Sequence, residues 1–312
     1  MNKILDLKVG WSCNNNCCHC VVANKRHYTF QQDFSLDEIK RMFLQWSSDA
    51  NTIVLTGGEP TLRKDIVEIC RFIKQQKPEV SLCLQTNGRK LSNQVLLNQL
   101  LPLVDDFTIA IHSCRKEIHD FITSTKGSWD ETMTAIAHIL NHDPKKLTTV
   151  TVISKYNLDD LYKTFLLLHS LGQFWKQLVF PHAMGNAWTN FEQVVPKYSE
   201  IENIIKLIIK DFGDFIIPSA IPPCYLTSNS RMMIEALKEY AGANKEAVCM
   251  ELCDQTGDEF FSRIQKEFAK SPACHDCCFD NLCPGVWKEY IVKYKDSLDL
   301  RPIKEDNIQC II

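Results

Sequence analysis

Three cysteines near the N-terminus are spaced so that they could bind one metal centre. Cys13, Cys17 and Cys20 form a C-x3-C-x2-C pattern directly after a β-rich run at 4–9. Three thiolates this close together can ligate three irons of a [4Fe–4S] cube and leave the fourth iron open to an outside ligand. An open iron distinguishes a catalytic cluster from one that only transfers electrons.

A zinc site is the alternative for the same residues. Clustered Cys and His side chains on short spacings commonly bind structural zinc, and His19 could supply a fourth ligand. Cys18 also permits a second register of three cysteines within this loop. The spacing alone leaves both kinds of metal centre open.

The elements that must position these cysteines follow a βα rhythm. Between residue 3 and about 180, short β-rich runs alternate with amphipathic helical patterns, which is typical of a parallel sheet covered by helices. The predicted strands lie at 4–9, 52–55, 80–85, 106–111, 148–153 and 178–180. The predicted helices lie at about 36–47, 64–77, 92–101, 129–141 and 158–171. Six such units predict an α/β fold, a partial (β/α)6 TIM-like barrel, whose carboxyl strand ends gather ligands at one edge.

The rhythm changes after the sixth predicted strand. An apolar helix is predicted at about 197–211, and a Pro-rich turn follows at 217–224. Residues 224–312 contain eight of the 15 cysteines and few secondary-structure signals, so we expect a metal to organise this segment. Two domains are predicted, a barrel at 1–215 and a cysteine-rich, metal-binding domain at 216–312.

The composition of the chain limits its partners and its compartment. The 312 residues are 45% apolar and 23% charged, with a formal net charge of -3, as in an ordinary globular protein. The sequence has no basic patch of the kind that binds nucleic acid, and no apolar stretch approaches the roughly 20 residues of a membrane span. We therefore expect a cytoplasmic protein with neither nucleic acid nor a membrane as partner, whose cysteines serve metal ligation more than disulfides.

The cysteine spacing at the end of the first strand of a βα repeat resembles the radical S-adenosylmethionine (SAM) superfamily. A Thr-Gly-Gly-Glu-Pro run after the second strand resembles the family's GGEP motif, whose backbone and glutamate meet the amino group of SAM. The motif residues are Gly57, Gly58, Glu59 and Pro60. The resemblance implies that the three cysteines hold a [4Fe–4S] cluster whose open iron binds SAM. One electron then breaks the S–C5′ bond and produces a 5′-deoxyadenosyl radical.

Other positions match those at which family members contact SAM. The resemblance implies contacts with the ribose, the methionyl carboxylate or the adenine from His19, Thr86, Asn87, Ser113, Ser154, Asn157 and His182. His19 stands where the family often places an aromatic ring against adenine, and His182 would line the open end of the barrel. Asn and Ser at strand ends are also common turn formers, so these contacts have a purely structural alternative. No catalytic residue is assigned beyond the cluster ligands.

Residues 112–139 carry a further resemblance. Glu-Ile-His-Asp at 117–120 and Lys-Gly-Ser at 126–128 resemble the EIHD…KGS stretch of radical SAM enzymes that modify peptides and related substrates. His119 and Asp120 are interpreted as part of a helix and its end, with no chemistry assigned to them.

The C-terminal cysteines resemble those of an auxiliary-cluster domain. Cys274, Cys277 and Cys283 form a C-x2-C-x5-C run similar to the centre of the SPASM domain and of its shorter relative, the twitch domain. A full SPASM domain would have another cysteine four residues after Cys283, where this chain has Trp287. The resemblance therefore implies one auxiliary iron–sulfur cluster, expected to be [4Fe–4S], rather than two.

The fourth ligand of this auxiliary cluster has two candidates. Cys224, which follows two prolines, is the preferred one, and Cys310 near the C-terminus could replace it. Cys249 and Cys253 could support a second cluster. Four thiolates in a small domain are also a common structural zinc site, so zinc is the alternative here as well.

The combined resemblance implies an oxidoreductase or maturase that abstracts a hydrogen atom from an unactivated carbon. A ribosomally made peptide is the expected substrate, and a flavodoxin- or ferredoxin-type protein is the expected electron donor. Because the chain starts at its first barrel strand, leader-peptide recognition would come from a separate protein. The alternatives are a radical SAM dehydrogenase of small molecules or cofactor biosynthesis, and a zinc or iron–sulfur binding module without SAM chemistry.

Overall fold

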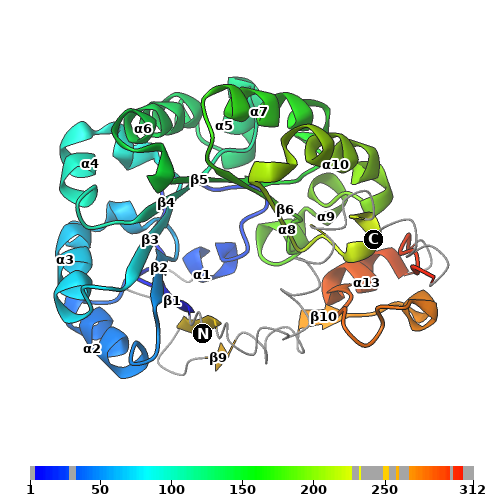
Figure 1. The fold of residues 1–312 in the computed structure, drawn as a ribbon, viewed down its shortest axis with the longest axis horizontal. Coiled ribbons are helices and arrows are strands. Elements are labelled where there is room, and N and C mark those ends of the chain that lie inside the picture. Colours follow the sequence, from blue (N-terminus) through cyan, green and yellow to red (C-terminus); the bar gives the residue numbers. More distant parts are fainter. Residues whose placement is uncertain are drawn as a thin grey trace.

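The chain folds into a curved sheet wrapped by helices (Figure 1). The computed structural model describes residues 4–27, 33–226, 232, 249–252, 258–259, 267–295 and 298–304. The main parallel strands are β1 (Ile4–Lys8), β2 (Thr52–Thr56), β3 (Ser81–Thr86), β4 (Asp106–Ala110), β5 (Leu147–Val152), β6 (Trp175–Val179) and β7 (Ile216–Ser219). They are hydrogen-bonded to one another in chain order. The predicted α/β class and the partial TIM-like barrel are confirmed.

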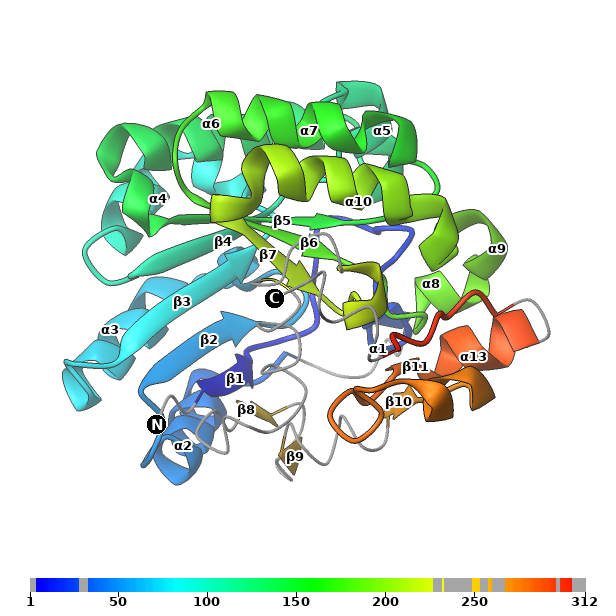
Figure 2. The same cartoon turned by 45° about the vertical axis from the view of Figure 1, so that its right-hand side comes forward.

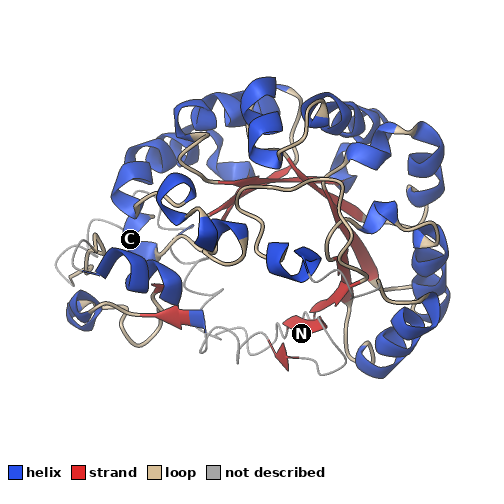
Figure 3. Cartoon of the chain, turned by 180° about the vertical axis from the view of Figure 1, so that it is seen from behind, coloured by secondary structure: helices blue, strands red, loops and turns tan. Residues whose placement is uncertain are grey.

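Helices follow the strands and cover the outer side of the sheet, as Figure 3 shows. The longer helices are α2 (Leu36–Trp46), α3 (Ile66–Gln76), α4 (Gln94–Leu100), α5 (Lys116–Thr123), α6 (Ser128–His142), α7 (Leu158–Ser170) and α10 (Tyr198–Phe212). The short helices are α1 (Ala23–His27), α8 (Asn186–Thr189) and α9 (Phe191–Val194). Within the described ranges, every helix is too short or too polar to cross a membrane.

The side chains of β1 alternate between two environments. Leu5 and Leu7 are fully buried in the apolar core between the sheet and the helices, whereas Asp6 and Lys8 line a cavity on the concave side. Because successive side chains of a strand point to opposite faces, this pattern directs polar groups into the barrel. The barrel therefore has an apolar shell and a partly polar interior.

The six predicted strands are present, and the structure adds a seventh. The bounds of most strands differ from the prediction by one or two residues, but β6 begins three residues earlier than the predicted 178–180. The seventh strand, β7, contains Pro218 and was expected to be a turn. Proline is tolerated on an edge strand, and β7 ends the described sheet on this side. The domain boundary between residues 215 and 216 stays a prediction, although β7 pairs with β6.

The cysteine-rich segment packs near α8 and α9 on one side of the barrel opening (Figure 2). It contains β10 (Phe268–Ala269), β11 (Val286–Trp287) and α13 (Lys288–Tyr294). The hydroxyl of Tyr290 accepts a hydrogen bond from the Tyr198 N–H at 3.1 Å and donates one to Asp299 at 2.6 Å. Tyr290 is buried in the same apolar cluster as Tyr198, so this segment and α10 share a core.

Two further strands extend the sheet beyond β1. The strand β8 (Cys249–Leu252) pairs with β1 in parallel, and β9 (Asp258–Glu259) pairs with β8 in the antiparallel direction. The sequence analysis did not predict either strand.

Asp120, near the end of α5, holds the beginning of α6. Its carboxylate accepts hydrogen bonds from the backbone N–H groups of Gly127 at 2.6 Å and Trp129 at 2.8 Å. It also accepts one from the Ser128 hydroxyl at 2.9 Å. The first amides of a helix have no partner within the helix, so this side chain satisfies two of them. Asp120 thus has the structural role that the sequence predicts.

We expect Asp120→Ala to lower the free energy of unfolding by about 1–2 kcal/mol at pH 7, as the loss of a helix cap does. Burial raises the pKa of Asp120, but the hydrogen bonds from Trp129, Gly127 and Ser128 outweigh it and lower this pKa overall. A lowered carboxyl pKa contributes stability above the ordinary value of about 3.9, and this stability is lost as the pH falls through the folded-state pKa. The difference in the free energy of unfolding between the wild type and Asp120→Ala should therefore shrink below about pH 4.

Denaturant titrations at several pH values measure this difference. Asp130→Ala is the matched control, because Asp130 is exposed in the first turn of the same helix and pairs only with Lys116 at the surface. Its loss should cost less than about 1 kcal/mol. Equal destabilisation by the two substitutions would contradict the capping role of Asp120.

Candidate functional site

The cysteine loop, defined here as residues 10–22, crosses the carboxyl ends of the strands. The Asn16 N–H donates to the Thr123 carbonyl at 2.9 Å, and the Cys18 N–H donates to the Ile122 carbonyl at 2.8 Å. The end of α5 therefore holds the middle of the loop. These backbone bonds fix the loop although it has little regular secondary structure of its own.

Asn186, at the start of α8, holds the other side of the cysteine loop. Its backbone N–H donates to the Cys20 carbonyl at 3.0 Å, and its side-chain amide donates to the Cys17 carbonyl at 2.8 Å. Both acceptors belong to predicted cluster ligands. The sequence analysis did not assign this role to Asn186, because a contact between residues so far apart in the chain leaves no local signal.

The glycines of the GGEP motif lie against the backbone of the cysteine loop. The Gly58 N–H donates to the Gly10 carbonyl at 2.9 Å. A Cβ atom at Gly58 would lie 2.3 Å from the Ser12 carbonyl oxygen, and one at Gly57 would lie 2.2 Å from that of Gly10. Only glycine allows such an approach. The resemblance implies that the backbone of this motif meets SAM; the structure shows its contact with the cysteine loop.

Glu59 is buried, with 3% of its surface exposed, and its carboxylate is surrounded by donors of the chain. One oxygen accepts from the Thr61 N–H at 3.0 Å and from the Thr86 hydroxyl at 2.6 Å, and the other accepts from the Asn87 N–H at 2.7 Å. Burial raises the pKa of Glu59 against the lowering effect of these hydrogen bonds. In this arrangement Glu59 joins the end of β2 to the end of β3.

Asn87 and Arg89, which follow β3, continue this connection to the cysteine loop. The Asn87 side-chain amide donates to the Asn14 side chain at 2.7 Å and lies 4.0 Å from the Cys13 sulfur. The Arg89 guanidinium donates to the Asn14 carbonyl at 2.6 Å and pairs with Glu131. The series of hydrogen bonds from Glu59 through Asn87 to Asn14 thus positions the neighbouring Cys13.

Three buried histidines stand beside the second cysteine. The rings of His19 and His112 have centroids 4.6 Å apart at 78°, and His112 stacks on His119 at 5.6 Å. Burial lowers the pKa of His19 and of His119 to about 4, and that of His112 well below its ordinary value, so all three rings are neutral at pH 7. Ligand atoms of Cys17, His19 and His112 lie within 4.8 Å of one another, so this trio could also hold a single metal ion.

One cavity brings most of the predicted cofactor residues together. Its volume is about 1400 Å³, including space open to solvent, and it lies on the concave side of the sheet. The predicted residues that line it are Cys13, Cys17, His19, Cys20, Gly57, Gly58, Glu59, Thr86, Asn87 and His182. The three sulfurs therefore face a space large enough for a bound ligand.

Four other predicted residues do not line this cavity. Ser113, Ser154 and Asn157 are completely buried. The Asn157 side chain donates to the His112 carbonyl at 2.8 Å and accepts from the Ser154 N–H at 2.8 Å. Pro60 is buried at the start of a short 3-10 helix. The hydrogen bonds of Ser154 and Asn157 are those of a turn, and the contact of the Ser and Asn residues with a ligand stays a prediction.

The interior of the barrel adds polar groups that the sequence analysis missed. Lys8 and Asp6 on β1 form an ion pair at 2.8 Å and line the cavity. On the opposite side, the cavity is lined by the apolar side chains of Val150, Val152 and Val179. A substrate in this space would meet charged groups on one side and apolar groups on the other. The signal in the sequence was the alternation of charged residues with leucines in β1.

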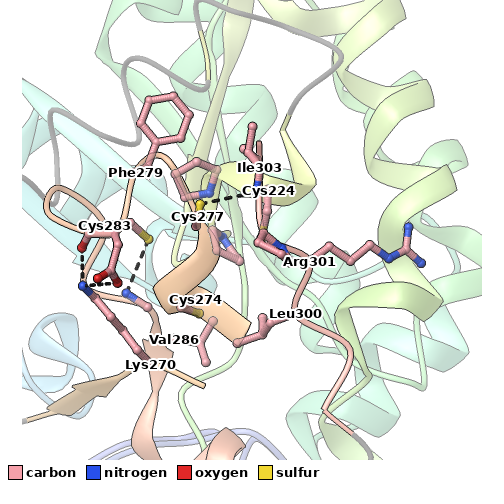
Figure 4. Close-up of a pocket in the computed structure, with 15 residues that line it drawn as sticks. Cys224, Lys270, Cys274, Cys277, Phe279, Cys283, Val286, Leu300, Arg301 and Ile303 are labelled. Carbon is pink, nitrogen blue, oxygen red and sulfur yellow. Dashed lines mark hydrogen bonds and ion pairs between the residues drawn. The ribbon is translucent and has the colours of Figure 1, made fainter. Parts of the chain in front are cut away.

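The C-terminal cysteine site is defined as Cys224, Cys274, Cys277 and Cys283. These four residues line one pocket, which has a volume of about 440 Å³ including space open to solvent and which Figure 4 shows in close-up. Cys224 lies in a short 3-10 helix after β7, and Cys274 lies in another after β10. The structure thus brings together all four cysteines that were preferred as ligands of an auxiliary centre.

Each sulfur of the C-terminal cysteine site has a hydrogen-bond partner. The Gly285 N–H donates to the Cys283 sulfur at 3.4 Å, and the Ile303 N–H donates to the Cys277 sulfur at 3.4 Å. The backbone of Arg301 bonds the Cys224 sulfur. The Ser271 hydroxyl lies 3.4 Å from the Cys274 sulfur. Burial raises the pKa of Cys224 to about 12 and that of Cys283 to about 11, and repulsion from the neighbouring cysteines adds to it. A bound metal would offset the cost of deprotonating these buried thiols, because metal ligation favours the thiolate form.

The C-terminal cysteine site can also be compared with the geometry of a single zinc ion. Two thiolates that bind one zinc at about 2.3 Å each cannot be more than about 4.6 Å apart. Among the described residues, Cys17, His19 and His112 are the only group of three or more possible ligands within 4.8 Å of one another. No three sulfurs of the C-terminal cysteine site lie within that distance of one another, and the kind of metal centre at this site stays a prediction.

The side chains of three other predicted cysteines lie outside what the structure describes. Cys253 and Cys310 lie outside the described residues, and Cys249 lies in β8 with its side chain not described. The choice between Cys224 and Cys310 therefore stays a prediction.

We expect Glu59→Gln to lower the free energy of unfolding by about 1–3 kcal/mol, because the new amide cannot accept the hydrogen bonds of one carboxylate oxygen and leaves a buried donor unsatisfied. Chemical denaturation measures the effect. Glu68→Gln is the control, since Glu68 makes only an exposed pair with Lys40. An unfolding free energy of Glu59→Gln as high as that of the control would refute the positioning role of Glu59.

Comparison with known proteins relates this cavity to a family. The sequence profile of the radical SAM superfamily matches residues 8–168. An AdoMet-dependent heme synthase of Methanosarcina barkeri is 27% identical over 207 residues, 64% of this chain and 58% of that protein. A mitochondrial GTP 3′,8-cyclase of Arabidopsis thaliana is 30% identical over 210 residues, 66% of this chain and 53% of that protein. The chain spans little more than half the length of these curated relatives.

Solved structures share the fold. SuiB of Streptococcus suis, bound to S-adenosylmethionine, superposes with a TM-score of 0.63 at 13% identity, covering 98% of this chain and 77% of that one. The structure titled native anSMEcpe with bound AdoMet gives a TM-score of 0.60 at 14% identity, covering 97% and 93%. At such low identity the likeness concerns the fold alone. The profile match, however, extends over just over half of the chain, and the chain belongs to the radical SAM superfamily.

Proposed function

We propose that this radical SAM enzyme abstracts a hydrogen atom from a ribosomally made peptide. The observation that carries the proposal is the single cavity that the cysteine loop, the GGEP loop and the inner face of the barrel share. A cofactor at the cysteines and a substrate in the barrel would meet there. Proximity and fixed orientation of this kind are what a radical reaction needs.

The residues of the chain would bind and position the reactants. Cys13, Cys17 and Cys20 would hold the [4Fe–4S] cluster, which supplies the electron that splits SAM into methionine and a 5′-deoxyadenosyl radical. Glu59 and Asn87 would keep the GGEP loop and the cysteine loop in register through their hydrogen bonds. These residues position the reactants and exclude water.

Peptide substrates are supported by what the structural neighbours bind. One structure of SuiB contains the precursor peptide SuiA, and one structure of anSMEcpe contains the peptide Cp18Cys. The stretch at 112–139 with its resemblance to peptide-modifying enzymes points the same way. A flavodoxin- or ferredoxin-type electron donor and a separate leader-recognition protein belong to this proposal.

A small-molecule substrate is the second candidate. The curated relatives are named a heme synthase and a GTP cyclase, and the Lys8–Asp6 pair at 2.8 Å in the cavity could bind a charged small molecule. Deuterium transfer to 5′-deoxyadenosine from deuterated candidates separates the two: transfer from a precursor peptide supports a maturase, and transfer from a small metabolite alone supports the second candidate.

We further propose that the C-terminal cysteine site holds one auxiliary [4Fe–4S] cluster in a twitch or partial SPASM-like domain at 216–312. Two features support a cluster: four cysteines line one pocket, and N–H groups bond to the sulfurs of three of them. Hydrogen bonds to the sulfurs of iron–sulfur clusters help to set their potentials. Such a cluster would exchange an electron with the substrate during turnover.

Replacement of Cys13, Cys17 and Cys20 together by Ala should remove one cluster and abolish SAM cleavage, because among the described residues these are the only cysteines that line this cavity. Iron per chain and 5′-deoxyadenosine, both measured after anaerobic reconstitution, provide the readout. Cys18→Ala is the matched control from the same loop and should retain both. SAM cleavage that survives the triple replacement would refute the ligand assignment.

Replacement of Cys274 and Cys277 by Ala should lower the iron content by about one cluster, roughly four irons per chain. Some 5′-deoxyadenosine should still form, since the cysteine loop is unchanged. Cys278→Ala is the control, because the C-x2-C-x5-C spacing does not include Cys278. Iron that stays at the wild-type level in the double variant would exclude these two residues as ligands.

A further inference from the structure

The strand β11 separates the two proposed metal sites. Val286 lines the pocket of the C-terminal cysteine site, and the next residue, Trp287, lines the large cavity of the barrel. Adjacent side chains of a strand point to opposite faces. One short strand therefore forms part of the wall of both spaces.

Two aromatic rings pack against Trp287. Its indole stacks on the His182 ring, which follows β6, with centroids 3.8 Å apart and an angle of 8°. On β10, the Phe268 ring lies 4.1 Å from the indole. A Glu289 carboxylate oxygen lies 3.3 Å from the His182 ring nitrogen Nε2. Residues of the C-terminal segment thus hold a histidine of the barrel across the wall of the cavity.

The same strand is connected directly to the C-terminal cysteine site. Four residue steps separate Cys283 from Trp287, a reach of at most about 14 Å. The Gly285 N–H donates to the Cys283 sulfur at 3.4 Å. A Cβ atom at Gly285, which has a φ of +94°, would lie 2.0 Å from the Ala269 carbonyl oxygen, so only glycine allows β11 to pack so closely against β10. A metal at Cys283 would therefore fix the position of Trp287.

We propose that Trp287 is a positioning residue for the radical reaction: stacked on His182, it forms the wall that shields the radical site from small molecules, and the C-terminal cysteine site holds that wall in place. The proposal rests on the proposed function. A carbon radical abstracts hydrogen from any suitable C–H bond that reaches it, so the walls of the cavity decide which carbon reacts. This gives the indole a role at the position where a full SPASM domain would have a cysteine.

The test uses the reconstituted holoenzyme with SAM and dithionite, and perdeuterated 2-propanol as a small probe. A deuterium atom transfers from carbon 2 of the alcohol to C5′ of the adenosyl radical, which leaves an alcohol radical and 5′-deoxyadenosine with one deuterium. Mass spectrometry of the 5′-deoxyadenosine should show severalfold more deuterium for Trp287→Ala than for the wild type. Trp287→Phe, which keeps an aromatic ring, should show a smaller increase.

Trp175→Ala is the matched control. Trp175 is 43% exposed and lies at the start of β6, whereas His182 follows the end of that strand. This variant should incorporate as little deuterium as the wild type.

Hydrogen–deuterium exchange of the same holoenzymes gives a readout that does not depend on turnover. The amides of residues 181–186 should exchange faster in Trp287→Ala and in the variant that lacks Cys274 and Cys277, whereas those of α3 should be unchanged. Unchanged exchange at 181–186 in the cysteine variant would overturn the coupling to the C-terminal cysteine site.

Two outcomes separate this inference from the proposed function. If Trp287→Ala makes 5′-deoxyadenosine with no more deuterium than the wild type, the wall has no shielding role and the inference is wrong. If the wild type makes no 5′-deoxyadenosine, the proposed function fails instead, and the exchange measurement still decides whether Trp287 holds residues 181–186.

Discussion

The site depends on the close contact between the backbone of the GGEP loop and that of the cysteine loop. The Gly58 N–H reaches the Gly10 carbonyl at 2.9 Å, and the Glu59 N–H reaches the Ser12 carbonyl at 2.7 Å. A side chain at either glycine of the motif would occupy the position of a carbonyl oxygen. The contact continues the parallel pairing of β1 and β2 beyond their ends. The sheet itself therefore determines where the cysteine loop begins.

Further segments hold the cysteine loop from different directions. Glu59 connects β2 to Asn87 after β3, α5 bonds the middle of the loop, and Asn186 bonds the carbonyls of Cys17 and Cys20. Each of these partners follows a different strand or helix of the barrel. Because the partners come from the rigid scaffold, a loop without regular structure can present three sulfurs to one cavity. The C-terminal segment adds Trp287 to the lining of that cavity.

Local patterns in the sequence predicted the strands and helices, and they singled out the cysteines that the structure brings together. The strands could be recognised because apolar runs such as that of β3 are bounded by turn residues, and the cysteine spacings stand out in the sequence itself. The strand β7 was missed because Pro218 is typical of a turn, and its pairing with β6 depends on the whole sheet. For Ser113, Ser154 and Asn157 the sequence left two roles open, because a residue that forms a turn and one that binds a ligand at a strand end look alike in sequence. Contacts over long sequence separations, such as those of Asn186 and Trp287, leave no local signal.

The central claim is that the chain uses an iron–sulfur cluster to cleave SAM and carries a second cluster behind β11. The most direct measurement is anaerobic reconstitution of the wild-type protein with iron and sulfide, followed by SAM and dithionite, with 5′-deoxyadenosine and metal per chain determined on the same sample. The account predicts 5′-deoxyadenosine together with roughly eight irons, as expected for two [4Fe–4S] clusters. Bound zinc in place of iron, with no 5′-deoxyadenosine, would contradict it.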